Sequence, residues 1–87
     1  MTEEQFNTEL QSIKNSVINL LHISGEISYQ MLLHQLSSIT YQNAESKVAL
    51  LFYFLVDSYN GDKSINDRLF ILFAPFRRQE EKKAKRE

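Results

Sequence analysis

An uninterrupted run of nine apolar residues, Val48 to Val56 (VALLFYFLV), restricts the fold more than any other feature of this sequence. It lies inside a predicted helix that starts after Asn43 and runs to about Tyr59, before the turn signal Asn60-Gly61-Asp62. Nine residues make about two and a half helical turns, so the run places apolar side chains on every side of the helix. One side is expected to enter the core. The opposite side must be covered by another element, a second copy or a partner.

Length and composition set the class of protein. The 87 residues suffice for one small domain, and two glycines and one proline favour helices over turns. There is no cysteine, which excludes disulfides and thiolate metal sites. No apolar stretch approaches about 18 residues, and the polar, acidic start Met1-Thr2-Glu3-Glu4 is not a secretory signal. We therefore expect an intracellular protein, cytoplasmic or nuclear, without a membrane partner.

Two helices are predicted before the apolar run. The first begins at the N-cap Thr2, with Gln5 completing a capping box, and ends at Gly25. Its apolar residues recur at steps of three and four: Phe6, Leu10, Ile13, Val17, Leu20 and Leu21. The second is predicted from Tyr29 to Ile39, with Ser28 as its N-cap and a hydrophobic staple between Ile27 and Leu32.

The segment from Ser64 to Phe76 permits two interpretations. A Ser64-x-x-Asp67 capping box and helical spacing from Ile65 onward indicate a helix. The short run Leu69–Phe73 (LFILF) is rich in strand formers and lies between turn residues and a proline, which indicates a strand. We favour the strand, and we expect Pro75 to end the element in either case.

The order of these elements resembles a winged-helix domain. Within that class the chain is similar to the C-terminal winged-helix domain of kleisins, the subunits that bridge the ATPase heads of SMC complexes. The resemblance covers residues 5 to 73 and depends on Asn43–Asp57 (NAESKVALLFYFLVD) and Asp67–Phe73 (DRLFILF). It implies an apolar third helix, a short turn and a terminal strand, used for protein contact.

The predicted fold is therefore mainly α: a small three-helix, winged-helix-like domain over residues 1–76, with a β wing at about 62–74. An all-α four-helix bundle is the alternative. Residues 77–87 are predicted to be a charged, solvated tail with six basic and three acidic side chains, net +3. Residues 1–76 carry four basic and eight acidic side chains, net −4. An acidic body makes nucleic acid an unfavourable partner.

The sequence contains no pattern typical of catalysis. His22 and His34 are the only histidines, and they lie on different predicted helices without metal-ligand spacing. Asp57, Asp62 and Asp67 lack the spacing of a calcium loop. No phosphate-binding loop or nucleophile motif is present. We therefore expect no enzyme activity, cofactor, metal or small-molecule substrate.

The surplus of aromatic and aliphatic side chains favours protein–protein interaction, as an adaptor, an inhibitor or an assembly subunit. The partner is expected to be another protein or further copies of this chain. A DNA-binding winged-helix regulator with a basic C-terminal tail is the alternative. The predicted contacts are apolar residues that we do not expect the core to bury: Leu51, Phe52, Leu55, Tyr59, Phe70 and Phe73.

Overall fold

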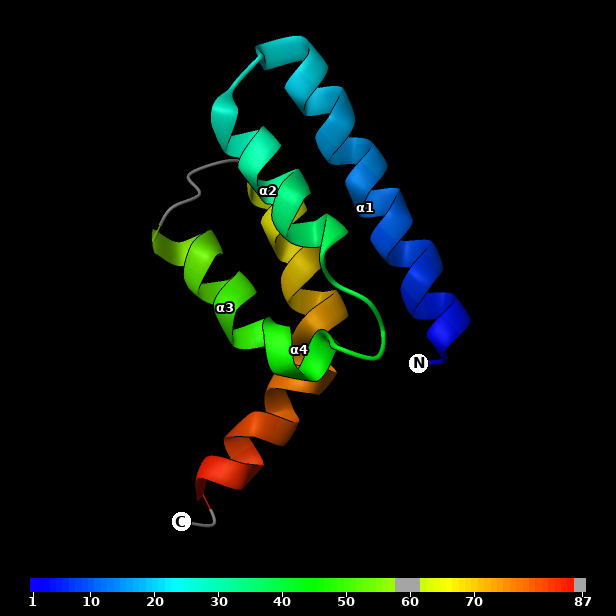
Figure 1. Ribbon diagram of the computed structural model, residues 1–87, viewed down its shortest axis with the longest axis vertical. Coiled ribbons are helices and arrows are strands. Elements are labelled where there is room, and N and C mark those ends of the chain that lie inside the picture. Colours follow the sequence, from blue (N-terminus) through cyan, green and yellow to red (C-terminus); the bar gives the residue numbers. More distant parts are fainter. Residues whose placement is uncertain (58–61, 86–87) are drawn as a thin grey trace.

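The computed structural model describes the backbone of residues 1–57 and 62–85 and the side chains of residues 1–56 and 62–76. This part of the chain forms four helices: α1 (Glu3–Ser24), α2 (Ile27–Ser37), α3 (Ala44–Asp57) and α4 (Lys63–Lys85). Successive helices alternate in direction, and the last turns of α4 extend beyond the body of the molecule (Figure 1). The described residues contain no strand, so the domain is mainly helical, in agreement with the coarse prediction.

Helix α1 has the ends that its sequence predicts. The Thr2 hydroxyl oxygen accepts a hydrogen bond from the Gln5 backbone N–H at 3.1 Å, and the Gln5 side-chain oxygen accepts one from the Thr2 N–H at 3.0 Å. This reciprocal pair satisfies two donors that the first helical turn leaves free. Gly25 ends the helix with φ of 67°, and its N–H donates to the Leu21 carbonyl oxygen. Both end predictions are confirmed.

Helix α2 begins and ends two residues earlier than predicted. Glu26 holds the N-cap position, whereas Ser28 lies within the first turn. The proposed staple is also wrong, because Ile27 belongs to the helix and is 71% exposed. The Glu26 side chain makes no cap hydrogen bond, so the start of this helix has no local capping signal in the sequence. The buried positions of that stripe are Leu32 and Leu36.

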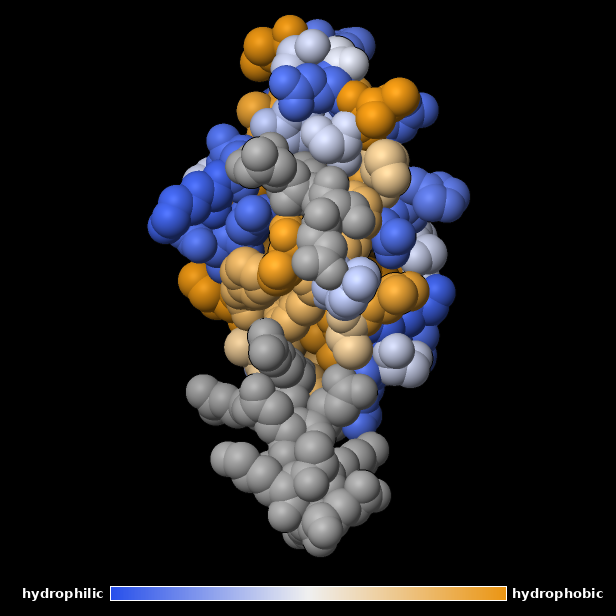
Figure 2. All heavy atoms as spheres, turned by 90° about the vertical axis from the view of Figure 1, so that its left-hand side faces the viewer, coloured by the Kyte–Doolittle hydropathy of each residue, from blue (hydrophilic) through white to orange (hydrophobic). Residues whose placement is uncertain are grey.

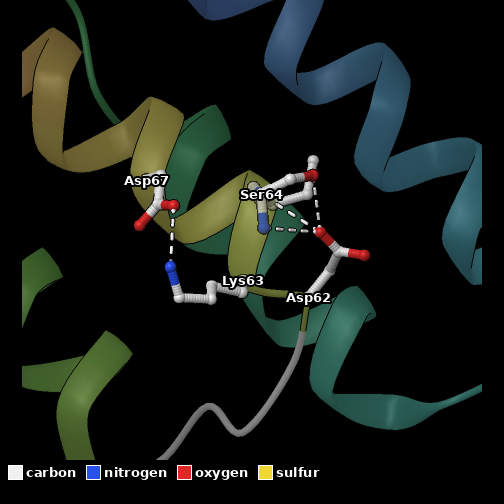
Figure 3. A network of polar contacts seen from close by, with 5 residues as sticks. Asp62, Lys63, Ser64 and Asp67 are labelled. Carbon is white, nitrogen blue, oxygen red and sulfur yellow. Dashed lines mark hydrogen bonds and ion pairs between the residues drawn. The ribbon is translucent and has the colours of Figure 1, made fainter.

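The predicted wing at 62–74 is wrong, because this segment belongs to helix α4. Asp62 caps the helix: one carboxylate oxygen accepts from the Ser64 N–H and hydroxyl at 2.8 and 2.7 Å, and from the Ile65 N–H at 3.1 Å (Figure 3). Lys63 forms an ion pair with Asp67 at 3.3 Å in the same turn. The segment is a helix and not a strand because the helical spacing of its apolar residues buries four side chains in one core: Ile65, Leu69, Leu72 and Phe73.

Pro75 does not end α4, contrary to the prediction, and the helix continues to Lys85. A proline inside a helix removes one backbone hydrogen bond, here the one to the carbonyl of Ile71. Both residues are exposed, so water can reach this part of the helix. Because residues 63–85 are helical, the terminal strand implied by the winged-helix and kleisin resemblance is not present in the described chain.

The helices approach one another closely in three pairs: α1 with α2, α1 with α4, and α3 with α4. Arg68 on α4 strengthens the second pair by donating to the hydroxyls of Ser16 and Ser12 and to the carboxylate of Glu9, at 3.1, 2.9 and 3.2 Å. Helix α3 therefore lies at the edge of the bundle, with α4 as its main neighbour (Figure 1).

An aromatic cluster closes one end of the core. The Phe6 ring of α1 lies 5.5 Å, centroid to centroid, from each of the rings of Tyr41, Phe73 and Phe76, all in edge-to-face geometry. These contacts join α1, the α2–α3 loop and α4. Edge-to-face pairs add about 0.5–1.5 kcal/mol each to the burial of the rings. The cluster thus fixes the point at which α4 leaves the body.

Candidate protein-contact surface

Helix α3 is positioned by the loop that precedes it. Asn43 and Thr40 exchange hydrogen bonds: the Asn43 side-chain oxygen accepts from the Thr40 N–H at 2.8 Å, and the Thr40 hydroxyl accepts from the Asn43 N–H at 3.2 Å. The Asn43 amide also donates to the Ser38 carbonyl oxygen at 3.1 Å. The helix begins at the next residue, Ala44, as its sequence predicts. Its predicted extension to about Tyr59 lies outside the described residues.

The inner side of α3 enters the core. Ala44 and Val48 are fully buried, and the same side continues one and two turns further on at Leu51 and Leu55, which are 1% and 3% exposed. Phe52 and Phe54 border this side and are each 7% exposed. Since each helical residue advances by about 100°, these six positions occupy nearly half of the circumference.

The opposite side of α3 is also apolar, and it is exposed. Leu50, Tyr53 and Val56 are 62%, 67% and 74% exposed. They recur every third residue and form one stripe, which we name the outer face of α3. The exposed small residues Ser46 and Ala49 lie on the same side. Figure 2 views the molecule from this side and shows apolar atoms gathered over α3.

The structure places most of the predicted contact residues in the core. Leu51, Phe52, Leu55 and Phe73 are buried, contrary to the expectation that the core would not absorb them. Phe70 is half-buried, and its ring lies 4.9 Å from that of Phe52 in edge-to-face geometry between α4 and α3. Tyr59 lies outside the described residues.

The prediction that the apolar run has two apolar sides is supported, but the sides were assigned incorrectly. A sequence signal for the correct assignment exists at the start of the helix. Ala44 and Val48 are the only apolar residues of the first turn and a half, because Glu45, Ser46 and Lys47 separate them. Continuing their spacing by three and four residues leads to Leu51 and Leu55, and leaves Leu50, Tyr53 and Val56 on the other side.

The remaining candidate groups do not converge on one place. His22 and His34 are exposed in the last turns of α1 and α2, and these turns lie apart because the two helices run in opposite directions (Figure 1). Among the described residues there is no group of three His, Cys, Asp or Glu side chains able to hold a metal ion. No helix in this part of the chain is long and apolar enough to cross a membrane.

A shallow groove of about 340 Å³ lies between α1 and α4. Its lining consists of Met1, Gln5, Glu9, Arg68, Ile71 and Leu72. The charged pair in this lining, Arg68 and Glu9, is already joined at 3.2 Å. The groove therefore offers a ligand mainly apolar contact, at Met1 and Ile71.

The outer face of α3 is the strongest candidate site, because it combines three exposed apolar side chains on one rigid helix. Its stripe contains no ionisable side chain other than the Tyr53 phenol. Isolated apolar residues are ordinary on protein surfaces, whereas a contiguous set is typical of an interaction site. No family model, curated protein or solved structure matches this chain, so the surface is interpreted from its own geometry.

Proposed function

We propose that this chain is a non-catalytic protein-binding module and that the outer face of α3 is its contact surface. The observation that carries the proposal is the exposure of Leu50, Tyr53 and Val56 on a helix whose inner side is already buried. A surface helix of a self-sufficient domain normally carries polar residues on its outer side. Here that side offers another protein a preformed apolar ridge.

The magnitude of the available burial supports contact with a partner. Complete burial covers about 200 Å² of an aromatic side chain and about 100 Å² of an aliphatic one. Multiplying these areas by the exposed fractions gives roughly 250 Å² of apolar surface for Leu50, Tyr53 and Val56 together. Covering that area gains about 6 kcal/mol before the cost of association. Because that cost is itself about 4–15 kcal/mol, neighbouring residues must contribute to a stable complex.

The DNA-binding alternative has less support. Reading base edges from a helix requires arginine, lysine, asparagine or glutamine on its outer side. Among the α3 side chains that the structure describes, the exposed positions hold serine, alanine, leucine, tyrosine and valine instead. The basic residues between Phe76 and Lys85 lie on the end of α4 that extends from the body (Figure 1). Salt-dependent binding of the intact chain to duplex DNA would favour this alternative.

The contact proposal is tested with two matched variants. Val56→Glu places a charge on the outer face of α3, and Ile71→Glu places one on α4 beside the α1–α4 groove; the two positions are 74% and 76% exposed. Each tagged protein is used to capture proteins from an extract of the source organism, with quantification by mass spectrometry. We expect at least one protein to be captured by the wild type and by Ile71→Glu and lost with Val56→Glu. Equal capture by all three proteins contradicts the proposal.

A further inference from the structure

We propose that the occupant of the outer face of α3 is a second copy of this chain, related by a two-fold axis that passes close to Tyr53. This inference rests on the proposed function and names its partner. Most oligomers of identical chains are symmetric, and in a two-fold dimer the same patch is used by both copies. A patch suited to this arrangement must be complementary to itself in shape and in charge.

The charge pattern meets that requirement. A two-fold interface places residues near the axis against their own copies, so a fixed charge there would meet a like charge. The whole run from Val48 to Val56 contains no Asp, Glu, Lys or Arg. The net charge of the chain is only −1, so two copies approach with little overall repulsion.

The spacing of the stripe also suits a two-fold axis. Leu50 and Val56 lie three residues on either side of Tyr53. If the two α3 helices are antiparallel, Leu50 meets Val56 of the other copy; if they are parallel, each residue meets its equivalent. In both arrangements the Tyr53 rings lie together at the axis. The small side chains of Ser46 and Ala49 on the same side permit close approach of the helices.

The apolar area reaches that of an ordinary interface only when a neighbouring patch is included. A standard interface buries about 800 Å² per partner, of which about 57% is apolar, or roughly 450 Å². The outer face of α3 supplies about half of this. The α1–α2 end carries further exposed aliphatic side chains, Ile23 at 84%, Ile27 at 71% and Met31 at 49%. They add roughly 200 Å², which brings the total to the expected value.

The position of this second patch agrees with such an interface. Figure 2 shows apolar atoms at the α1–α2 end of the molecule as well as over α3, on the same face. The interface is therefore expected to extend from α3 toward the start of α2. Interfaces of this size have dissociation constants between picomolar and micromolar, so a dimer is expected to form at micromolar chain concentration.

The experiment is sedimentation equilibrium of the intact chain between about 1 and 300 µM, a range that brackets micromolar dissociation. Wild type, Val56→Glu and Ile71→Glu are compared after circular dichroism has shown equal helix content. We expect the wild type and Ile71→Glu to dimerise, and Val56→Glu to associate at least about tenfold more weakly. If Val56→Glu loses helix content, Leu50→Lys replaces it, since Leu50 is also exposed on the outer face.

The outcomes separate this inference from the proposed function. If the wild type stays monomeric, the proposal that a second copy occupies the outer face of α3 is wrong. Capture of a different protein that depends on Val56 would still support the outer face of α3 as a contact surface. A dimer that Val56→Glu leaves unchanged overturns the inference, because another surface then forms it. A two-fold axis at Tyr53 predicts one further result: Tyr53→Lys mixed with Tyr53→Glu associates more strongly than either variant alone. Equal association in all three samples overturns the axis position.

Discussion

The orientation of α3 is best tested with two adjacent leucines that the structure places in opposite environments. Leu51 is 1% exposed and Leu50 is 62% exposed, although both lie within the same apolar run. Replacing a buried leucine with alanine removes its burial and leaves a cavity, which costs about 2–5 kcal/mol. The same replacement at an exposed position changes stability by about 0.5 kcal/mol or less, since alanine also favours the helix.

The difference is large compared with the stability of a domain of this size. A chain of 87 residues has a total unfolding free energy of about 4–13 kcal/mol. Leu51→Ala is therefore expected to lower the urea midpoint by about 2 M or more, at an m-value of about 1 kcal/mol/M, whereas Leu50→Ala leaves it nearly unchanged. The measurement is urea unfolding followed by circular dichroism at the helix band, at a protein concentration at which the chain is monomeric, with the m-value fitted for each variant.

A milder pair serves if Leu51→Ala fails to fold. Val48 is fully buried and Val56 is 74% exposed, so Val48→Ala is expected to cost about 1–2 kcal/mol more than Val56→Ala. Equal midpoints within either pair would refute the assigned inner and outer sides of α3. The outer face, the proposed contact surface and the two-fold interface would then all lose their basis.

Two further predictions concern the interior and the start of α4. Pro75→Ala is expected to raise the unfolding free energy by about 1–3 kcal/mol, because it restores a hydrogen bond to the Ile71 carbonyl and removes no buried side chain; an unchanged or lower thermal midpoint contradicts this. Hydrogen bonds from Ser64 and from the Ile65 backbone hold the pKa of Asp62 below its ordinary value of 3.8. Because the pKa is lower in the folded state, the stability that the carboxylate contributes is complete above the unfolded-state pKa and is lost as the pH falls through the folded-state pKa. Asp62→Asn keeps a capping oxygen but cannot be protonated, so this variant is expected to lose less thermal stability than the wild type below about pH 4. Equal loss of thermal stability in both proteins argues against this role of Asp62.

Local chemistry made the ends of α1 and the start of α3 predictable. The Thr2–Gln5 capping box, Gly25 and Asn43 act within a few residues, so their effects do not depend on distant neighbours. The start of α2 was predicted two residues too late, because Ser28 is a preferred N-cap residue, whereas Glu26 holds the N-cap position without a side-chain cap hydrogen bond. The local pattern around α4 was ambiguous in the same way, since a five-residue apolar run fits a strand or a buried helix.

Tertiary packing resolved that ambiguity. As a helix, residues 63–76 place Ile65, Leu69, Leu72 and Phe73 on one side, against α1 and α3. A strand would need a neighbouring strand to pair its backbone groups, and the described chain provides none. The same packing carries the helix through Pro75, because Phe73 before the proline and Phe76 after it both contact Phe6.

The sequence by itself determined that α3 is a helix with apolar side chains all around it, because composition and spacing are local properties. It did not readily indicate which side faces inward, because a run that is apolar at every position has almost no periodicity to orient it. The packing of α3 against α4 decided this by burying Val48, Leu51 and Leu55 and leaving Leu50, Tyr53 and Val56 exposed. A helix at the edge of a bundle has a neighbour on one side only, and for that physical reason the other side remains available to a partner.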